Sequence, residues 1–178
     1  YKIEFNGSTG VLIKNPTTNL TYSGTSWNLN KWQHLVITRD SSNDLKIYRN
    51  GEYWGGGTHS GTFIFDRISG FNSSSRHFSG NLSNFQRWNT TLSDLQVETL
   101  YNNGVPLTTA IASDNLKGWW KLDNTATFST NWSIPDASGN GNTGTSSGMT
   151  EQNLVNNNVS ALNGISSGMT SANLVLTD

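Results

Sequence analysis

The stretch from residue 31 to residue 54 constrains the fold most, because it has the pattern of three antiparallel strands joined by two tight turns. Residues 32–39 carry apolar side chains on both alternating faces, as expected for a strand that is covered on both sides. A cluster of Asp, Ser and Asn at 40–44 predicts the first turn. Asn50-Gly51 predicts the second, because a type I′ hairpin turn requires positive φ at both central residues. The stretch therefore predicts a β-meander with little helical character.

Short runs between turn residues predict further strands, and one segment has the signature of a helix. The helix starts after Ser93, where Gln96 completes a capping box, and the stop signal Asn103-Gly104 ends it. The further strands are predicted at residues 1–5, 11–14, 19–22, 62–68, 78–88 and 116–123.

The meander resembles the laminin-G-like branch of the concanavalin-A-like lectin/glucanase sandwiches. That family shows a Trp-x-His strand followed by a Tyr-x-(Asp/Asn)-Gly hairpin, and residues 32–34 and 48–51 match these two motifs. Residues 78–89 resemble the family's late strand, and residues 92–104 resemble the short helix that follows it. The resemblance covers residues 1–106. It implies an all-β fold, an antiparallel jelly-roll β-sandwich with one short helix and an irregular C-terminal tail.

The order of the family's segments predicts the domain organisation. Residues 116–123, which read Leu-Lys-Gly-Trp-Trp-Lys-Leu-Asp, and the Gly/Asn turn at 134–144 resemble the segment that usually opens a laminin-G-like domain. Residues 1–106 then correspond to the later part of such a domain, with its opening strands absent ahead of them. Two alternatives follow for residues 107–145, which either complete this sandwich in permuted order or start a second module.

Residues 146–178 form a tail that contains a two-copy repeat. The sequence Ser-Ser-Gly-Met-Thr-Glu-Gln-Asn-Leu-Val at 146–155 recurs at 166–175 as Ser-Ser-Gly-Met-Thr-Ser-Ala-Asn-Leu-Val. Thr150 and Thr170 are each predicted to cap a single helical turn. Linked units of this kind after a Trp-Trp-Lys-Leu-Asp strand resemble tails in structural proteins of marine bacteriophages that carry laminin-G-like modules.

Composition excludes several classes of protein. The formal net charge is −1 and no run is basic, so a nucleic-acid partner is not expected. No stretch approaches the roughly 18 apolar residues that a membrane span requires, so none is predicted. The chain has no Cys, which excludes disulfides, a thiolate nucleophile and Cys-ligated zinc.

The acidic residues and histidines do not have the pattern of an active site. Glucanases of this superfamily carry a Glu-x-Asp-x-x-Glu strand, and retaining cleavage needs two carboxyl groups about 5 Å apart. No Glu of this chain lies in such a pattern, so we predict that the protein is not an enzyme. His34 occupies a packing position of the family, whereas His59 and His77 are expected to be solvated loop residues.

Exposed aromatic and short polar side chains are the candidates for glycan binding, because sugars are held by aromatic platforms together with amide and hydroxyl groups. In the alternative interpretation, Trp27 and Trp54 cap the sandwich core, since Trp usually buries most of its area. The candidate residues are Trp27, Tyr53, Trp54, Asn72, Arg76 and His77.

A calcium ion is the one cofactor that the sequence suggests. Asp136, Ser138, Asn140 and Asn142 offer oxygen atoms at alternating positions of a Gly-rich loop, as ligands for Ca²⁺ do. Since only one of the four is a carboxylate, the favoured alternative is an Asx-turn in which Asp136 binds local backbone amides.

Two non-enzymatic functions fit these observations. The first is a virion structural or accessory protein of a phage, in a capsid decoration, fibre or tail, with the virion surface as its location. Its partners would be further copies of itself or other virion proteins, and host-surface polysaccharide. The alternative is a carbohydrate-binding adhesion module of a secreted bacterial protein, located outside the cell or at the cell surface.

Overall fold

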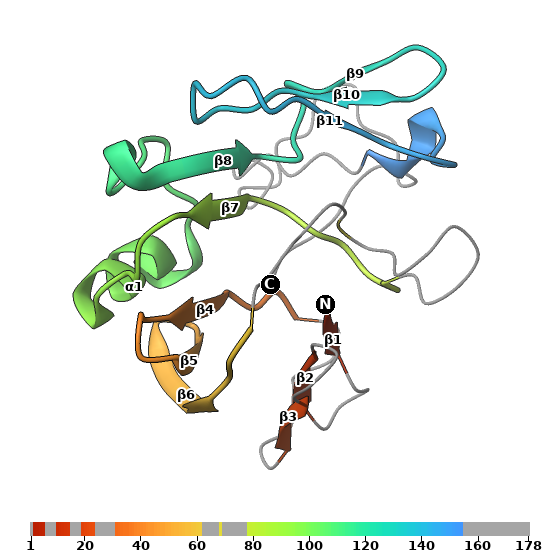
Figure 1. The fold of residues 1–178 in the computed structure, drawn as a ribbon. Helices are drawn as coiled ribbons and strands as arrows, with labels where there is room; N and C mark the ends of the chain where they lie inside the picture. Colours follow the sequence, from red (N-terminus) through yellow and green to blue (C-terminus); the bar gives the residue numbers. More distant parts are fainter. Residues whose placement is uncertain are drawn as a thin grey trace. The chain divides into compact units, whose positions relative to one another are not determined.

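The structure is a computed structural model that describes residues 2–5, 10–14, 19–23, 31–61, 68 and 78–154 (Figure 1). The chain divides into two compact units. The first unit contains residues 1–80 and 91–104, and the second contains residues 81–90 and 105–178. The predicted domains are continuous in sequence, whereas this division interleaves two short segments, and the predicted boundaries at 106 and 145 remain a prediction.

The first unit holds two three-stranded antiparallel sheets. One has the order β1-β2-β3, formed by β1 (Lys2–Phe5), β2 (Gly10–Lys14) and β3 (Asn19–Ser23). The other has the order β4-β5-β6, formed by β4 (Leu35–Arg39), β5 (Asp44–Arg49) and β6 (Glu52–Thr58). The second sheet confirms the predicted meander, although β4 begins at Leu35, three residues later than the alternation suggested.

Both sheets of the first unit contribute to one apolar core. Val11 and Ile13 come from β2, Leu45 and Ile47 come from β5, and all four side chains are fully buried. Burial of each such side chain stabilises the fold by about 1.5–3 kcal/mol. The partly buried Ile3, Leu35, Ile37 and Trp54 pack against this cluster.

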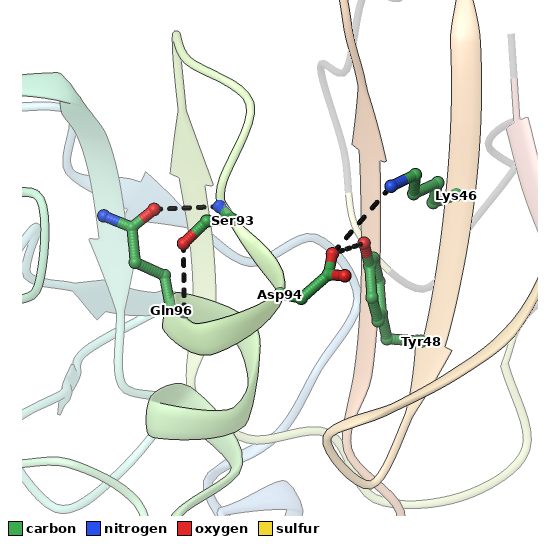
Figure 2. Close-up of polar contacts among 5 residues, drawn as sticks. All are labelled: Lys46, Tyr48, Ser93, Asp94 and Gln96. Atoms are coloured by element: carbon green, nitrogen blue, oxygen red, sulfur yellow. Dashed lines mark hydrogen bonds and ion pairs between the residues drawn. The ribbon is translucent and has the colours of Figure 1, made fainter.

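The predicted helix is α1 (Asp94–Tyr101), and its capping box is confirmed. The Ser93 side chain accepts a hydrogen bond from the Gln96 N–H at 3.3 Å, and the Gln96 side chain accepts one from the Ser93 N–H at 2.9 Å (Figure 2). Val97 and Leu100 are the buried residues of the helix. The helix ends one residue before the predicted stop, because Asn102 already adopts left-handed backbone with φ 44°.

The first turn of α1 is tied to β5. The Tyr48 hydroxyl donates to Asp94 Oδ1 at 2.6 Å, and Lys46 Nζ lies 3.9 Å from the same oxygen (Figure 2). An acidic residue in the first turn also interacts favourably with the helix dipole. Burial, followed by the contact with Asp94, raises the pKa of Tyr48 to about 12.

The second unit contains the remaining strands. β7 (Phe85–Trp88) pairs with β8 (Leu116–Trp120), and β9 (Thr127–Phe128), β10 (Trp132–Ile134) and β11 (Gly144–Thr145) form a sheet in the order β11-β10-β9. β7 is shorter than the strand predicted at 78–88, because residues 81–84 are irregular and Asn84 has φ 56°. β9, β10 and β11 were not predicted, since each has only two or three residues in a turn-rich part of the chain. The described residues also form three short 3-10 helical turns. The first unit contains η1 (Asn102–Gly104), and the second unit contains η2 (Ser113–Asn115) and η3 (Glu151–Asn153). Thr150 is the N-cap of η3, as predicted, whereas the second copy of the tail repeat, with Thr170, lies outside the described residues.

Antiparallel sheets and one short α-helix in the described residues confirm the predicted all-β fold class. None of the helices described is long and apolar enough to cross a membrane. The strand predicted at 62–68 falls almost entirely outside the described residues.

Candidate functional site

A surface hollow lies in the first unit at the hairpin between β5 and β6. Its volume is about 240 Å³. We call it the hairpin hollow. It is lined by Arg49, Asn50, Glu52, Tyr53, Trp54 and Tyr101.

The turn chemistry of Asn50-Gly51 shapes one end of the hairpin hollow. Asn50 and Gly51 have φ 52° and 82°, as a type I′ turn requires. Two bonds of 2.9 Å tie the turn to His34, the residue before β4. The Asn50 side-chain Oδ1 accepts from the His34 N–H, and the Asn50 N–H donates to the His34 carbonyl. A Cβ on Gly51 would lie 3.0 Å from Cδ1 of Tyr101, so only glycine lets the turn approach the last residue of α1 this closely.

A β-bulge places the aromatic side chains. Tyr48 pairs with Tyr53 and Ile47 pairs with Gly55, so Trp54 is the extra residue of β6. In a regular strand Tyr53 and Trp54 would face opposite sides of the sheet, and a bulge re-aims such neighbours. As a result, both side chains line the hairpin hollow.

The two aromatic residues differ in exposure and in surroundings. Tyr53 is 62% exposed and meets the buried Tyr48 ring edge to face, with 6.0 Å between the ring centroids. Trp54 is half-buried, packs against the core cluster, and holds the Arg49 guanidinium 5.2 Å from its ring centroid. Trp54 therefore covers the core, as the alternative interpretation expects, and also lines the hairpin hollow.

The structure describes only part of the predicted glycan site. Tyr53 and Trp54 lie together in the hairpin hollow, whereas Trp27, Asn72, Arg76 and His77 lie outside the described residues. Sequence reasoning missed Arg49 and Glu52, which flank the Asn-Gly turn, and Tyr101, which comes from a distant part of the chain. The position of Arg49 and Glu52 beside a hairpin tip was a usable signal, but nothing in the sequence places Tyr101 there.

Two histidines of the first unit differ in burial, since His34 is half-buried and His59 is buried. His34 stacks on Tyr101 with 5.9 Å between the centroids, as expected for a packing residue, and burial lowers the pKa of its imidazole. His59 was expected to be a solvated loop residue, and this was wrong, because its side chain is fully buried. Its N–H donates to the Asn43 carbonyl at 2.9 Å and its carbonyl accepts from Arg39 at 3.1 Å, which draws the residue into the end of the sheet.

The predicted calcium loop lies in the second unit and is bound to β8 by hydrogen bonds. Asp136 Oδ1 accepts from the N–H groups of Trp119 and Ser138, both at 2.9 Å, and Oδ2 accepts from the Asn142 N–H at 3.0 Å. Asn140 Nδ2 donates to the Leu116 carbonyl at 2.8 Å. The loop thus covers the strand next to Trp119 and Trp120, with Trp120 Nε1 donating to the Asn142 carbonyl at 2.6 Å.

These bonds set the ionisation of Asp136. Burial by itself would raise its pKa, but bonds from the Ser138 side chain and from the amides of Trp119, Ser138 and Asn142 lower the pKa to about 2. This arrangement is the one that the Asx-turn alternative expects. The described residues contain no group of three His, Cys, Asp or Glu side chains that could hold a metal ion. A calcium ion at Asp136, Ser138, Asn140 and Asn142 remains a prediction.

Comparison with known proteins agrees with this all-β architecture. The family model described as the concanavalin A-like lectin/glucanases superfamily matches residues 1–98. The chain belongs to this superfamily. No curated protein matches the chain significantly.

Among solved structures, the chain is similar to a crystal structure from Bacteroides ovatus of a "putative carbohydrate binding protein". The two share 27% identity with a TM-score of 0.60 over 78% of this chain, which spans 40% of the length of the Bacteroides protein. Neither match names a phage protein.

Proposed function

We propose that this chain is a carbohydrate-binding module and that the hairpin hollow holds the sugar. The observation that carries the proposal is the exposed Tyr53 ring beside Trp54, in a hollow that also presents a guanidinium, a carboxylate and an amide. Membership of a lectin/glucanase superfamily and the similarity to the Bacteroides protein support the same function. The adhesion module of a secreted bacterial protein is therefore favoured over the virion protein, which neither comparison supports.

Three of the lining residues contact the sugar in this proposal. The Tyr53 ring stacks on the apolar face of a pyranose, Arg49 donates to sugar oxygens and Glu52 accepts from hydroxyl groups. A volume of about 240 Å³ is below the roughly 300 Å³ at which ligand pockets usually begin, so the hairpin hollow takes the end of a glycan and not a long segment of it. A site of this size is expected to bind weakly, with a Kd of about 1 mM or somewhat lower.

The proposed function is binding without catalysis. Glu52 is the only acidic side chain among the described residues that line the hairpin hollow. A glycosidase needs a second carboxyl group, about 5 Å away for retention or roughly 6.5–9.5 Å away for inversion. We place the module outside the cell or at the cell surface, where host or environmental glycans are accessible.

The test is a glycan-array screen followed by calorimetric titration of the best oligosaccharide against matched variants. Tyr53→Ala should weaken binding about tenfold or more, because it removes the stacking surface. Leu95→Ala is the matched control, since Leu95 is an apolar side chain that is 72% exposed on α1 and does not line the hairpin hollow. Unchanged affinity in a folded Tyr53→Ala protein, or no glycan bound by the unaltered chain, would contradict the proposal.

A further inference from the structure

Two side chains of opposite charge lie side by side in the hairpin hollow. Arg49 is the last residue of β5, Glu52 is the first residue of β6, and the two pair directly across the Asn50-Gly51 turn. Directly opposed residues of antiparallel strands share one face of the sheet, with their Cβ atoms about 4.5–5.5 Å apart. Because both side chains line the hairpin hollow, a sugar that enters it meets a guanidinium and a carboxylate together.

The formal charges of the lining cancel. The Arg49 guanidinium lies 5.2 Å from the centroid of the Trp54 ring, and the Glu52 side chain is exposed. An amide, two phenols and an indole make up the rest of the lining. Lys46, which is also on β5, lies 3.9 Å from Asp94 Oδ1, so a carboxylate already compensates its charge. The hairpin hollow therefore offers an anion no net positive charge.

The hydrogen-bonding capacity of the pair determines which groups can occupy it. A guanidinium only donates hydrogen bonds, and an ionised carboxylate only accepts them. Two neighbouring sugar hydroxyl groups satisfy both, since one accepts from Arg49 and the other donates to Glu52. A sugar carboxylate could accept from Arg49, but it would lie beside Glu52 with the same charge and no proton to share.

We propose that the hairpin hollow selects neutral sugars over acidic ones, an inference that rests on the proposed function of the same site. Glu52 is the specificity-determining residue. The ligand class is a glycan that ends in an uncharged pyranose with free neighbouring hydroxyl groups. Glycans that end in a hexuronic acid bind about tenfold more weakly, because two carboxylates repel each other at this distance on a protein surface.

Three matched pairs of sugars test this selectivity in the full chain. The methyl glycosides of glucose, galactose and mannose are each compared with the methyl glycoside of the corresponding uronic acid, which differs only by oxidation of C6 to a carboxylate. NMR titration at pH 7, followed at the Tyr53 and Tyr101 signals, gives the Kd of each sugar. The neutral sugar that binds best should bind about tenfold more tightly than its uronic acid.

Glu52→Gln removes the charge and keeps the size of the side chain. The uronic acid should then bind about tenfold more tightly, and the preference for the neutral sugar should fall to about twofold or less. The gained affinity should be lost between about 0.01 M and 1 M salt, since it comes from attraction by Arg49. Glu98→Gln is the matched control, because Glu98 is an exposed glutamate of α1 that does not line the hairpin hollow. It should change the preference by less than about twofold.

Three results would overturn the proposal, and each has a different consequence for the sugar site. If the unaltered chain binds uronic acids as tightly as neutral sugars, or more tightly, the selectivity is wrong while the sugar site stands. If Glu98→Gln changes the preference as much as Glu52→Gln, the net charge of the first unit sets it and Glu52 has no specific role. If none of the six sugars gives saturable shifts, the selectivity and the sugar site fail together. Urea unfolding checks that both variants are folded.

Discussion

Replacing Asp136 with Asn tests whether the Asx loop stabilises the second unit through its charge. Asp136 accepts a hydrogen bond from the Trp119 amide, which joins the loop to β8, and bonds from the Ser138 and Asn142 amides within the loop. The gap between the ordinary pKa of 3.8 and about 2 corresponds to roughly 2 kcal/mol, since one pKa unit is 1.36 kcal/mol. We therefore expect Asp136→Asn to lower the free energy of unfolding by about 2 kcal/mol at pH 7.

The pH dependence of this loss separates charge from shape. The folded-state pKa of Asp136 is lowered, so the stabilisation is fully present above about pH 4 and is lost as the pH falls towards 2. Urea unfolding of both proteins between pH 7 and pH 2 should show the difference shrink to near zero. Asp114→Asn, at an exposed position of the same unit, is the control and should change stability by at most about 0.5 kcal/mol. A difference that stays constant with pH would refute the reasoning.

Three further predictions concern the helix contact, the hairpin turn and the calcium site. Tyr48→Phe should destabilise the chain by about 1 kcal/mol in urea unfolding, because Asp94 loses its hydrogen bond at 2.6 Å. The loss is small because Asp94 is exposed, so water replaces the lost bond. An unchanged unfolding midpoint would contradict this prediction. Gly51→Ala should lower the free energy of unfolding by about 1–2 kcal/mol, since it adds strain at φ +82° and a close contact with Tyr101. An unchanged free energy of unfolding would argue against this packing. Calcium should leave the Tm unchanged, because backbone amides already occupy the Asp136 oxygens, whereas a rise in Tm would support the predicted ion site.

Local turn chemistry made much of the fold predictable. Asn50-Gly51 and the Asp-Ser-Asn cluster before Asp44 define the two turns of the meander, and Ser93 with Gln96 defines the start of α1. In each case the signal is a backbone requirement met by residues close in sequence. The Asx-turn alternative at Asp136 was accessible for the same reason, since part of its bonding is to residues two and six positions further along the chain.

Features that depend on distant packing were not predictable. The bulge at Trp54 changes which face its side chain occupies, and alternation along β6 gives no sign of it. Tyr101 reaches the hairpin hollow only because α1 ends beside Gly51. The burial of His59 depends on backbone bonds to Arg39 and Asn43, and β10 is too short for its periodicity to be recognised.

The measurement that tests the proposed function most directly is an NMR titration of the full chain with the best oligosaccharide from the array. Chemical-shift changes are predicted to be largest at residues 49–54 and at Tyr101. Changes that concentrate on the loop at 136–142 instead, or an absence of saturable shifts, would contradict a sugar site at the hairpin hollow.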